Sequence, residues 1–166
     1  MLQNNLMNKI KAKAKEKKRT IVLPESHDER VLKAVGILLN EKICSVITIG
    51  NEQKILEDAQ RMNLNLSGIK IYDQSNSEKA EEFSRIFYEM RKTKGVTPES
   101  AREIIKRDLF FGAMLVKEGL ADGSVAGSTA STGDVLKAAL QCVGMPEGIS
   151  VVSSFFMMIF PEKVYS

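Results

Sequence analysis

Short apolar runs alternate with longer helical repeats along most of the chain. The short runs are rich in Ile, Val and Leu and several end at Pro, Gly or Asn, which is typical of strands. The predicted strands are 20–23, 45–49, 69–72, 124–126 and 150–160. Between them, apolar residues recur every three or four positions, which predicts amphipathic helices. The predicted helices are 28–40, 52–62, 78–92, 98–118 and 134–143.

One helix start is marked clearly by its residue types. Thr97 is a favoured N-cap residue, Pro98 suits the first helical position, and Glu99 complements the positive end of the helix dipole. The helix that begins there is expected to run without a break to about Glu118, because its apolar positions keep one helical period.

This order of strands and helices predicts an α/β fold. Strands joined by right-handed helical crossovers form a mostly parallel sheet with helices on both faces, a three-layer αβα arrangement. The apolar run 150–160 lies close to the last residue and would need a covering layer. We therefore expect a first α/β domain over 1–150 and the truncated start of a second domain over 151–166.

Composition and charge restrict the class of partner. The chain is 43% hydrophobic and 27% charged, as expected for a soluble globular protein. Its net charge of +3 comes mostly from 9–19, a basic run without aromatic residues that suits a solvated helix better than a nucleic-acid or membrane contact. No apolar run reaches the ~20 residues of a membrane span, and the N-terminus lacks the apolar block of a signal peptide. We expect a cytoplasmic protein with no nucleic-acid or membrane partner.

Cysteine and histidine are too few for a disulfide framework or a metal site. Cys44 and Cys142 each lie in an apolar pattern and are expected to be buried thiols. His27 is the single histidine and follows a strand, beside two acids. It would act there as an acid–base group or, alternatively, as an ordinary turn or cap residue. We predict no bound metal.

The richest candidate chemistry lies in the loop 127–134, Gly-Ser-Thr-Ala-Ser-Thr-Gly-Asp. Glycine allows close approach of a ligand, hydroxyls are compact donors, and the N-terminus of the following helix favours an anion. Lys137, one turn into that helix, would add positive charge. The spacing excludes a Walker A loop and a dinucleotide-binding fingerprint. The loop predicts a phosphate or carboxylate site, unless Thr132 or Asp134 only caps the helix and the serines form a tight turn.

Three segments, in register along the chain, resemble one enzyme family. They are Leu23-Pro24-Glu25 after the first strand, 87–95 (Phe-Tyr-Glu-Met-Arg-Lys-Thr-Lys-Gly), and the loop 127–134 with the Val-Leu-Lys that follows it. All three are similar to segments of phosphate acetyltransferase and its relative phosphate butyryltransferase, and the similarity runs from about Ile10 to the last residue.

The resemblance implies an acyltransferase that moves an acetyl group between coenzyme A and inorganic phosphate, and so a role in acetate metabolism. It also implies two α/β domains around a cleft, of which this chain is an incomplete, N-terminal part, in an enzyme that is usually a homodimer. Acetyl-CoA, phosphate and acetyl phosphate are then substrates, and no bound cofactor is implied. The family's catalytic base, an aspartate, would lie beyond Ser166, so this chain alone is expected to have little activity.

The resemblance also implies a set of substrate-binding residues. Arg91 matches a family arginine that binds coenzyme A or phosphate, although by itself it is also typical of a charge at a helix C-terminus. The family's phosphate or acyl-phosphate loop is matched by Ser128, Thr129, Ser131 and Thr132. Lys137 stands where typical acetyltransferases have arginine, and lysine does not clamp an oxyanion with two parallel hydrogen bonds. Lys163 replaces a family cysteine.

Three other interpretations stay open. Phosphate butyryltransferase differs in its acyl chain, and Lys137 leaves that preference undecided. A non-catalytic, phosphate-binding α/β fragment would need no further residues, with a dimer or partner covering 151–160. The third is the acyltransferase-like domain fused to some malic enzymes, although nothing like a malic-enzyme domain precedes these motifs.

Overall fold

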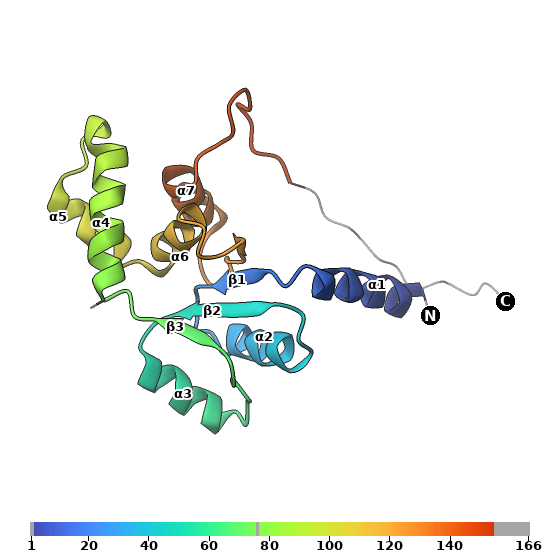
Figure 1. Cartoon of the computed structure of the whole chain (residues 1–166). Helices are drawn as coiled ribbons and strands as arrows, with labels where there is room; N and C mark the ends of the chain where they lie inside the picture. The colour runs from blue at the N-terminus through green and yellow to red at the C-terminus, as the bar shows by residue number, and fades with distance from the viewer. Residues whose placement is uncertain (1, 76, 155–166) are drawn as a thin grey trace.

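A four-stranded parallel sheet forms the centre of the molecule (Figure 1). The computed structural model describes residues 2–75 and 77–154. The strands lie in the order β3-β2-β1-β4. They are β1 (Thr20–Leu23), β2 (Ser45–Ile49), β3 (Lys70–Tyr72) and β4 (Gly123–Ser124). Thr20 pairs with Ser45 at one end of the β1–β2 ladder, and Val22 pairs with Ser124 on the other side of β1.

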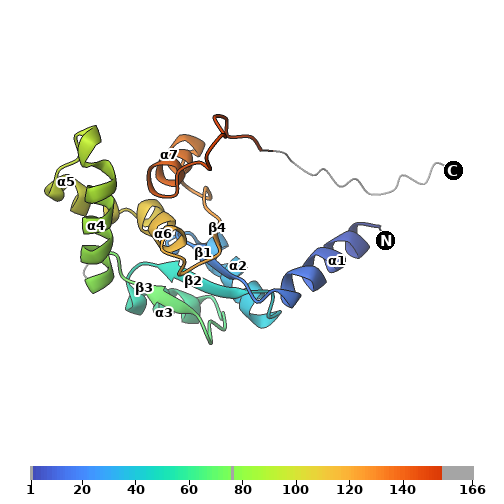
Figure 2. The ribbon, with the colours of Figure 1, turned by 45° about the horizontal axis from the view of Figure 1, so that its top comes forward.

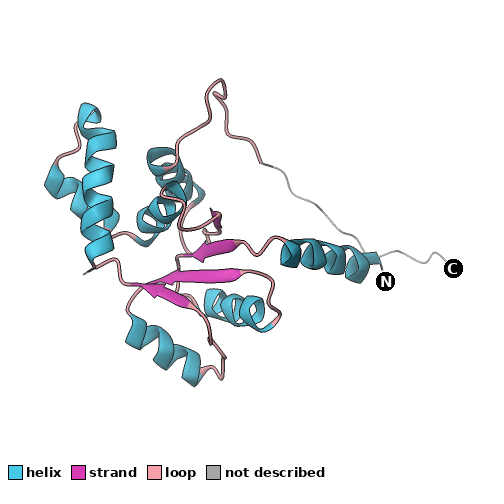
Figure 3. Cartoon of the chain, in the orientation of Figure 1, coloured by secondary structure: helices cyan, strands magenta, loops and turns pink. Residues whose placement is uncertain are grey.

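Helices cover both faces of this sheet, as the sequence predicts. They are α1 (Leu2–Glu16), α2 (Glu29–Asn40), α3 (Glu52–Arg61), α4 (Glu78–Arg91), α5 (Pro98–Ile105), α6 (Asp108–Lys117) and α7 (Thr132–Cys142), with a short 3₁₀ turn, η1 (Lys92–Lys94), after α4. The α2 and α3 helices lie on one side and α6 on the other, while α4 and α5 form a helical hairpin at the side of the molecule (Figures 1 and 3). Figure 2 shows α1 leading away from the sheet.

Side-chain caps fix where several helices begin. Asp28, Asn51 and Ser77 each stand before a helix in extended backbone and accept a hydrogen bond from an amide of the first turn. Thr97 and Ser100 form a reciprocal capping box, with Pro98 at the first helical position. The predicted start of that helix is confirmed.

The strands supply side chains to a separate core on each face. Leu23 and Val46 point to the face that packs against α2 and α3. Their neighbours Val22 and Ile47 point to the opposite core, because successive side chains of a strand alternate between faces. A parallel sheet that is covered on both faces therefore has nearly continuous apolar strands.

The larger core is built around four phenylalanines. Phe83 packs against Phe111 with ring centroids 5.1 Å apart, and Phe87 meets Phe110 edge-on at 5.9 Å. Gly112 lets α6 approach the sheet closely, since a Cβ there would lie 3.3 Å from side-chain atoms of both Ile49 and Val22. This core fixes α6, and with it the loops at the carboxyl end of the sheet.

The unbroken helix expected over 98–118 is wrong. It is interrupted at Lys106 and Arg107, and Arg107 has extended backbone with φ −81° and ψ 128°. The α5 half packs against α4, whereas six consecutive residues of α6, 110–115, are buried against the sheet and its neighbours. One straight helix does not reach both α4 and the sheet. Tertiary packing therefore breaks the helix, although the apolar period in the sequence continues.

Two strand predictions also differ from the structure. The strand β4 covers Gly123–Ser124 and not 124–126, because its pairing with β1 ends at Ser124. Residues 150–154 form no strand, and the rest of the predicted strand 150–160 lies outside the described residues. Cys142 is buried as expected, while Cys44 is half-buried, and both thiols are free. None of the helices in the described part of the chain is long and apolar enough to cross a membrane.

Candidate functional site

Two loops meet at the carboxyl end of the sheet, between β1 and β4. Along the chain, β2 and β3 are added on one side of β1, and β4 is then added on its other side. The order of the strands therefore reverses between β1 and β4, and such a switch point is where open α/β sheets usually bind their ligands. The segment 24–28 after β1 and the segment 125–131 after β4 come together there.

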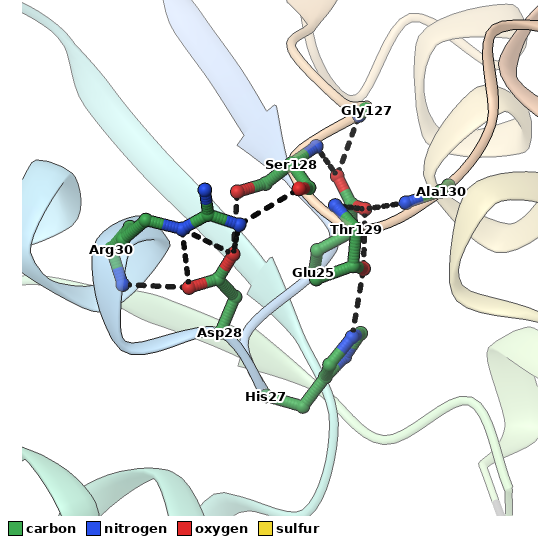
Figure 4. Close-up of polar contacts among 8 residues, drawn as sticks. All are labelled: Glu25, His27, Asp28, Arg30, Gly127, Ser128, Thr129 and Ala130. Carbon is green, nitrogen blue, oxygen red and sulfur yellow. Dashed lines mark hydrogen bonds and ion pairs between the residues drawn. The ribbon is translucent and has the colours of Figure 1, made fainter.

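The side chain of Glu25 joins these two loops (Figure 4). Its Oε2 accepts the amides of Gly127 at 2.6 Å and Ser128 at 2.9 Å. Its Oε1 accepts the amides of Thr129 and Ala130, both at 2.8 Å, and the Thr129 hydroxyl, also at 2.8 Å. The loop amides that the sequence predicts as an anion site do bind an anion, and that anion is Glu25.

Glu25 is charged although it is buried. Only 2% of the surface of Glu25 is exposed to solvent. Burial by itself raises the pKa of Glu25, but the hydrogen bonds from the amides of 128–130 and from the Thr129 hydroxyl outweigh it, and the resulting pKa is about 2. A carboxylate that is fully ionised and fully hydrogen-bonded is a poor general base near neutral pH.

A second contact between the loops is made by Asp28, Arg30 and Ser128 (Figure 4). Asp28 accepts the Ser128 hydroxyl at 2.5 Å and the guanidinium of Arg30 at 2.7 Å. Arg30 also donates to the carbonyl oxygen of Ser128 at 2.8 Å. The hydrogen bonds from Arg30, followed by that from Ser128, lower the pKa of Asp28 well below its usual range. The loop after β4 is thus held at two points.

His27 lies on the exposed side of the same contact. Its Nε2 is 3.1 Å from the Thr129 hydroxyl, and its Nδ1 is 3.6 Å from a carboxylate oxygen of Asp108, the first residue of α6. Burial raises the pKa of Asp108, against the opposing charge of His27. The other Asp108 oxygen accepts the Gln74 amide at 2.6 Å. His27 therefore lies between the loop after β4 and the start of α6, a geometry that fits both of the roles considered for it.

The four hydroxyl candidates lie in one loop but differ in their contacts. The hydroxyls of Ser128 and Thr129 are engaged by Asp28 and Glu25. Ser131 caps α7: its Oγ accepts the Asp134 amide at 3.1 Å and donates to the Asp134 carboxylate at 2.7 Å. The alternative of a helix cap is thus realised by Ser131 and not by Thr132 or Asp134. Thr132 is the first residue of α7 and is exposed.

The two basic candidates, Lys137 and Arg91, lie on different helices and differ in burial. Lys137 is exposed on α7, in the turn after the loop. Arg91 is half-buried at the end of α4, and its Nε is buried without a hydrogen-bond partner among the described residues. Its charge acts on Cys142, whose pKa burial raises to about 12. Cys142 ends α7, at the opposite end of this helix from the loop.

Sequence reasoning gave no role to three residues of this site: Glu25, Asp28 and Arg30. Glu25 was visible only as part of a motif, and Asp28 only as a helix start. The signal that marks them is their position, since charged residues directly after a buried strand lie at the ligand-binding edge of an α/β sheet. Among the described residues, no three His, Cys, Asp or Glu side chains gather closely enough to hold a metal ion.

The fold and this geometry define an α/β protein with a hydroxyl-rich candidate site at the switch point of its sheet. A protein-family model described as Phosphate acetyl/butaryl transferase matches residues 5–166. The chain belongs to the phosphate acetyl/butaryl transferase family, which confirms the resemblance drawn from the three motifs.

Named relatives and solved structures agree with this membership. Phosphate acetyltransferase of Acetivibrio thermocellus is 45% identical over 97% of this chain and 48% of its own length. That of Bacillus subtilis is 41% identical over 97% of this chain and 50% of its own length. A EutD phosphotransacetylase structure from Staphylococcus aureus matches with a TM-score of 0.79 and 40% identity, over 89% of this chain and 44% of that one. A phosphotransacetylase structure from Streptococcus pyogenes matches with a TM-score of 0.83 and 32% identity, over 89% and 45%.

The matches cover different shares of this chain and of its relatives. This chain is matched almost completely, yet it spans about half the length of the relatives it matches.

Proposed function

We propose that this chain forms the first half of an enzyme that transfers an acetyl group between coenzyme A and inorganic phosphate. The observation that carries the proposal is the hydroxyl-rich loop at the switch point between β1 and β4, held in one conformation by Glu25 and Asp28. Membership of the family and relatives named phosphate acetyltransferase support the reaction.

In the proposed reaction, the thiolate of coenzyme A attacks the carbonyl carbon of acetyl phosphate. The carbon–oxygen bond to the phosphate breaks, acetyl-CoA forms and phosphate leaves, and the thiol proton goes to a base. Glu25 is not that base, because its pKa is about 2 and the loop already surrounds its carboxylate. We assign the base to the second half of the enzyme, where the family resemblance implies an aspartate.

This half would bind and orient the acyl phosphate. Thr132 offers an exposed hydroxyl at the end of the loop, next to Ser131, whose hydroxyl caps α7, and Lys137 would add positive charge there. Arg91 would reach a more distant part of the substrate, such as a phosphate of coenzyme A, since it lies towards the other end of α7. Donors fixed in this way stabilise developing negative charge without reorganising during the reaction.

The remaining expectations belong to the same proposal. Coenzyme A is treated as a substrate, with no bound cofactor, and the complete enzyme as a homodimer. A first domain over 1–150 and the start of a second over 151–166 fit the half-length match to the relatives. Localisation in the cytoplasm is part of the same proposal, and the free thiols Cys44 and Cys142 are compatible with it.

The first test is acyl transfer from acetyl-CoA and butyryl-CoA to phosphate. Two proteins are compared: this chain alone, and this chain joined after Ser166 to the second half of the Acetivibrio thermocellus relative. We expect activity in the joined protein, faster with acetyl-CoA, and a rate lower by at least ~10² to 10⁴-fold in the chain alone, because the base is missing. Faster transfer from butyryl-CoA would assign the enzyme to the phosphate butyryltransferase branch of the family. No transfer by the joined protein would contradict the proposed reaction.

A further inference from the structure

Glu25 uses the whole hydrogen-bonding capacity of its carboxylate inside the fold. Four consecutive amides, 127–130, and the Thr129 hydroxyl donate to it. An ionised carboxylate offers about four lone-pair positions, so none remains for a substrate proton. The side chain is also closed off from solvent, at 2% exposure. Glu25 is therefore unsuited to direct chemistry, although it lies at the centre of the candidate site.

The same contact removes four amides from the reach of a substrate. Successive N–H groups that converge on one point are the geometry with which a backbone nest binds phosphate. Here that point is filled by a side chain that arrives from the end of β1, directly after Pro24. A phosphate that used these amides would first have to expel a buried carboxylate and leave it without partners, which is strongly unfavourable.

We propose that Glu25 is a positioning residue of the acyl-transfer site. Its carboxylate takes the place that a phosphate would take in the 127–130 amides, and it thereby fixes the loop before substrate binds. The substrate then meets the part of the loop that Glu25 leaves uncovered, which begins at Ser131. This role rests on the proposed function, because it is defined by the reaction that the loop serves.

The physical reason is preorganisation. Without Glu25, the loop would have four amides with no partner in the fold, and Gly127 would be free to leave its left-handed conformation at φ +98°. Substrate binding would then have to order the loop, and that ordering reduces the rate of a step that depends on fixed donors. Asp28 and Arg30 hold only the Ser128 end of the loop, so they do not replace Glu25.

The first experiment measures amide hydrogen exchange and amide chemical shifts by NMR in this chain. The variants are Glu25→Gln, which removes the charge, and Glu25→Asp, which keeps it on a shorter side chain. Glu103→Gln is the matched control, on an exposed side chain of α5. We expect exchange of the 127–130 amides to be at least ~10-fold faster in Glu25→Gln, with partial protection in Glu25→Asp and no change in the control.

Inorganic phosphate is the probe in the unchanged chain, so this part depends on no variant. Added phosphate should leave the shifts of the 127–130 amides unaltered, because Glu25 already occupies them. Phosphate-dependent shifts at these four amides would overturn the proposal. So would a Glu25→Gln variant that folds and keeps their protection.

The second experiment measures steady-state kinetics in the joined protein, in which this chain is followed by the second half of the Acetivibrio thermocellus relative. We expect Glu25→Gln to lower kcat by ~10 to 10²-fold with KM for acetyl-CoA changed less than about 3-fold, and Glu25→Asp to recover part of the loss. An unchanged kcat in Glu25→Gln would overturn the positioning role. If the unmodified joined protein transfers no acyl group, the proposed function fails, while the exchange data still decide whether Glu25 holds the loop.

Discussion

At the scale of single residues, Glu25 makes the stability of this protein depend on pH. Its folded-state pKa of about 2 lies below the ordinary value of 4.5. A group whose pKa is lowered on folding stabilises the protein above its ordinary pKa, and this contribution is lost as pH falls towards the folded-state pKa. The loss is therefore expected between about pH 4.5 and pH 2, and it amounts to about 3 kcal/mol at most, at 1.36 kcal/mol per pKa unit.

Urea unfolding at pH 7, 4 and 3 tests this dependence. The free energy of unfolding should fall over this range in the unchanged chain, and should fall less in Glu25→Gln, which has no carboxylate to protonate. Glu103→Gln, with its exposed side chain on α5, serves as the control and should follow the unchanged chain. Equal pH dependence in all three proteins would show that Glu25 is not the group responsible.

The sequence predicted the residue types of this site but not its central contact. The loop 127–134 was identified from its glycines, its hydroxyls and the helix that follows. Glu25 lies 102 to 105 positions away from the amides it binds. No local pattern encodes a contact of that kind, because it exists only once β4 is placed beside β1. Arg91 was identified from a shared motif alone, and its role in binding coenzyme A or phosphate stays a prediction.

At the scale of secondary-structure elements, sequence reasoning succeeded where the signal is local. Capping residues and helical periods located the starts of α2, α3, α4, α5 and α7 to within two residues, as at Asp28 and Thr97. It failed at the junction of α5 and α6, where the apolar period continues across Lys106 and Arg107. The break there arises from packing against two different partners, which a single period does not reveal.

The closeness of α6 to the sheet can be tested with two glycines in helices. Gly112→Ala should destabilise the protein by ~1 to 3 kcal/mol, because its Cβ would lie 3.3 to 3.4 Å from Ile49, Val22 and Pro24. Gly36→Ala is the matched change in α2, where the nearest atom is 3.5 Å away, and should be neutral or stabilising by up to ~1 kcal/mol. Thermal and urea unfolding measure both. If both variants behave alike, the close approach of α6 is not a constraint.

At the scale of the whole molecule, the two cores share one sheet and should not unfold separately. Val22 and Leu23 are neighbours in β1 yet belong to different cores, and the same holds for Val46 and Ile47 in β2. Loss of packing on one face therefore removes the strands that the other face needs. We expect one cooperative transition for the described part of the chain.

The two free cysteines report on one core each. Cys142 belongs to the core around α6, and Cys44 packs against the core beneath α2. Burial raises the pKa of both thiols, so pulsed labelling with a thiol reagent at mildly alkaline pH should modify them mainly on unfolding. As the urea concentration is raised, both cysteines should become reactive at the same midpoint.

The variant Leu32→Ala tests the coupling of the two cores, because it creates a cavity only in the core that Cys44 packs against. It should lower both midpoints together, with a loss of ~2 to 5 kcal/mol in the free energy of unfolding. A lower midpoint for Cys44 alone would mean that α2 and α3 unfold independently of the face that carries α6.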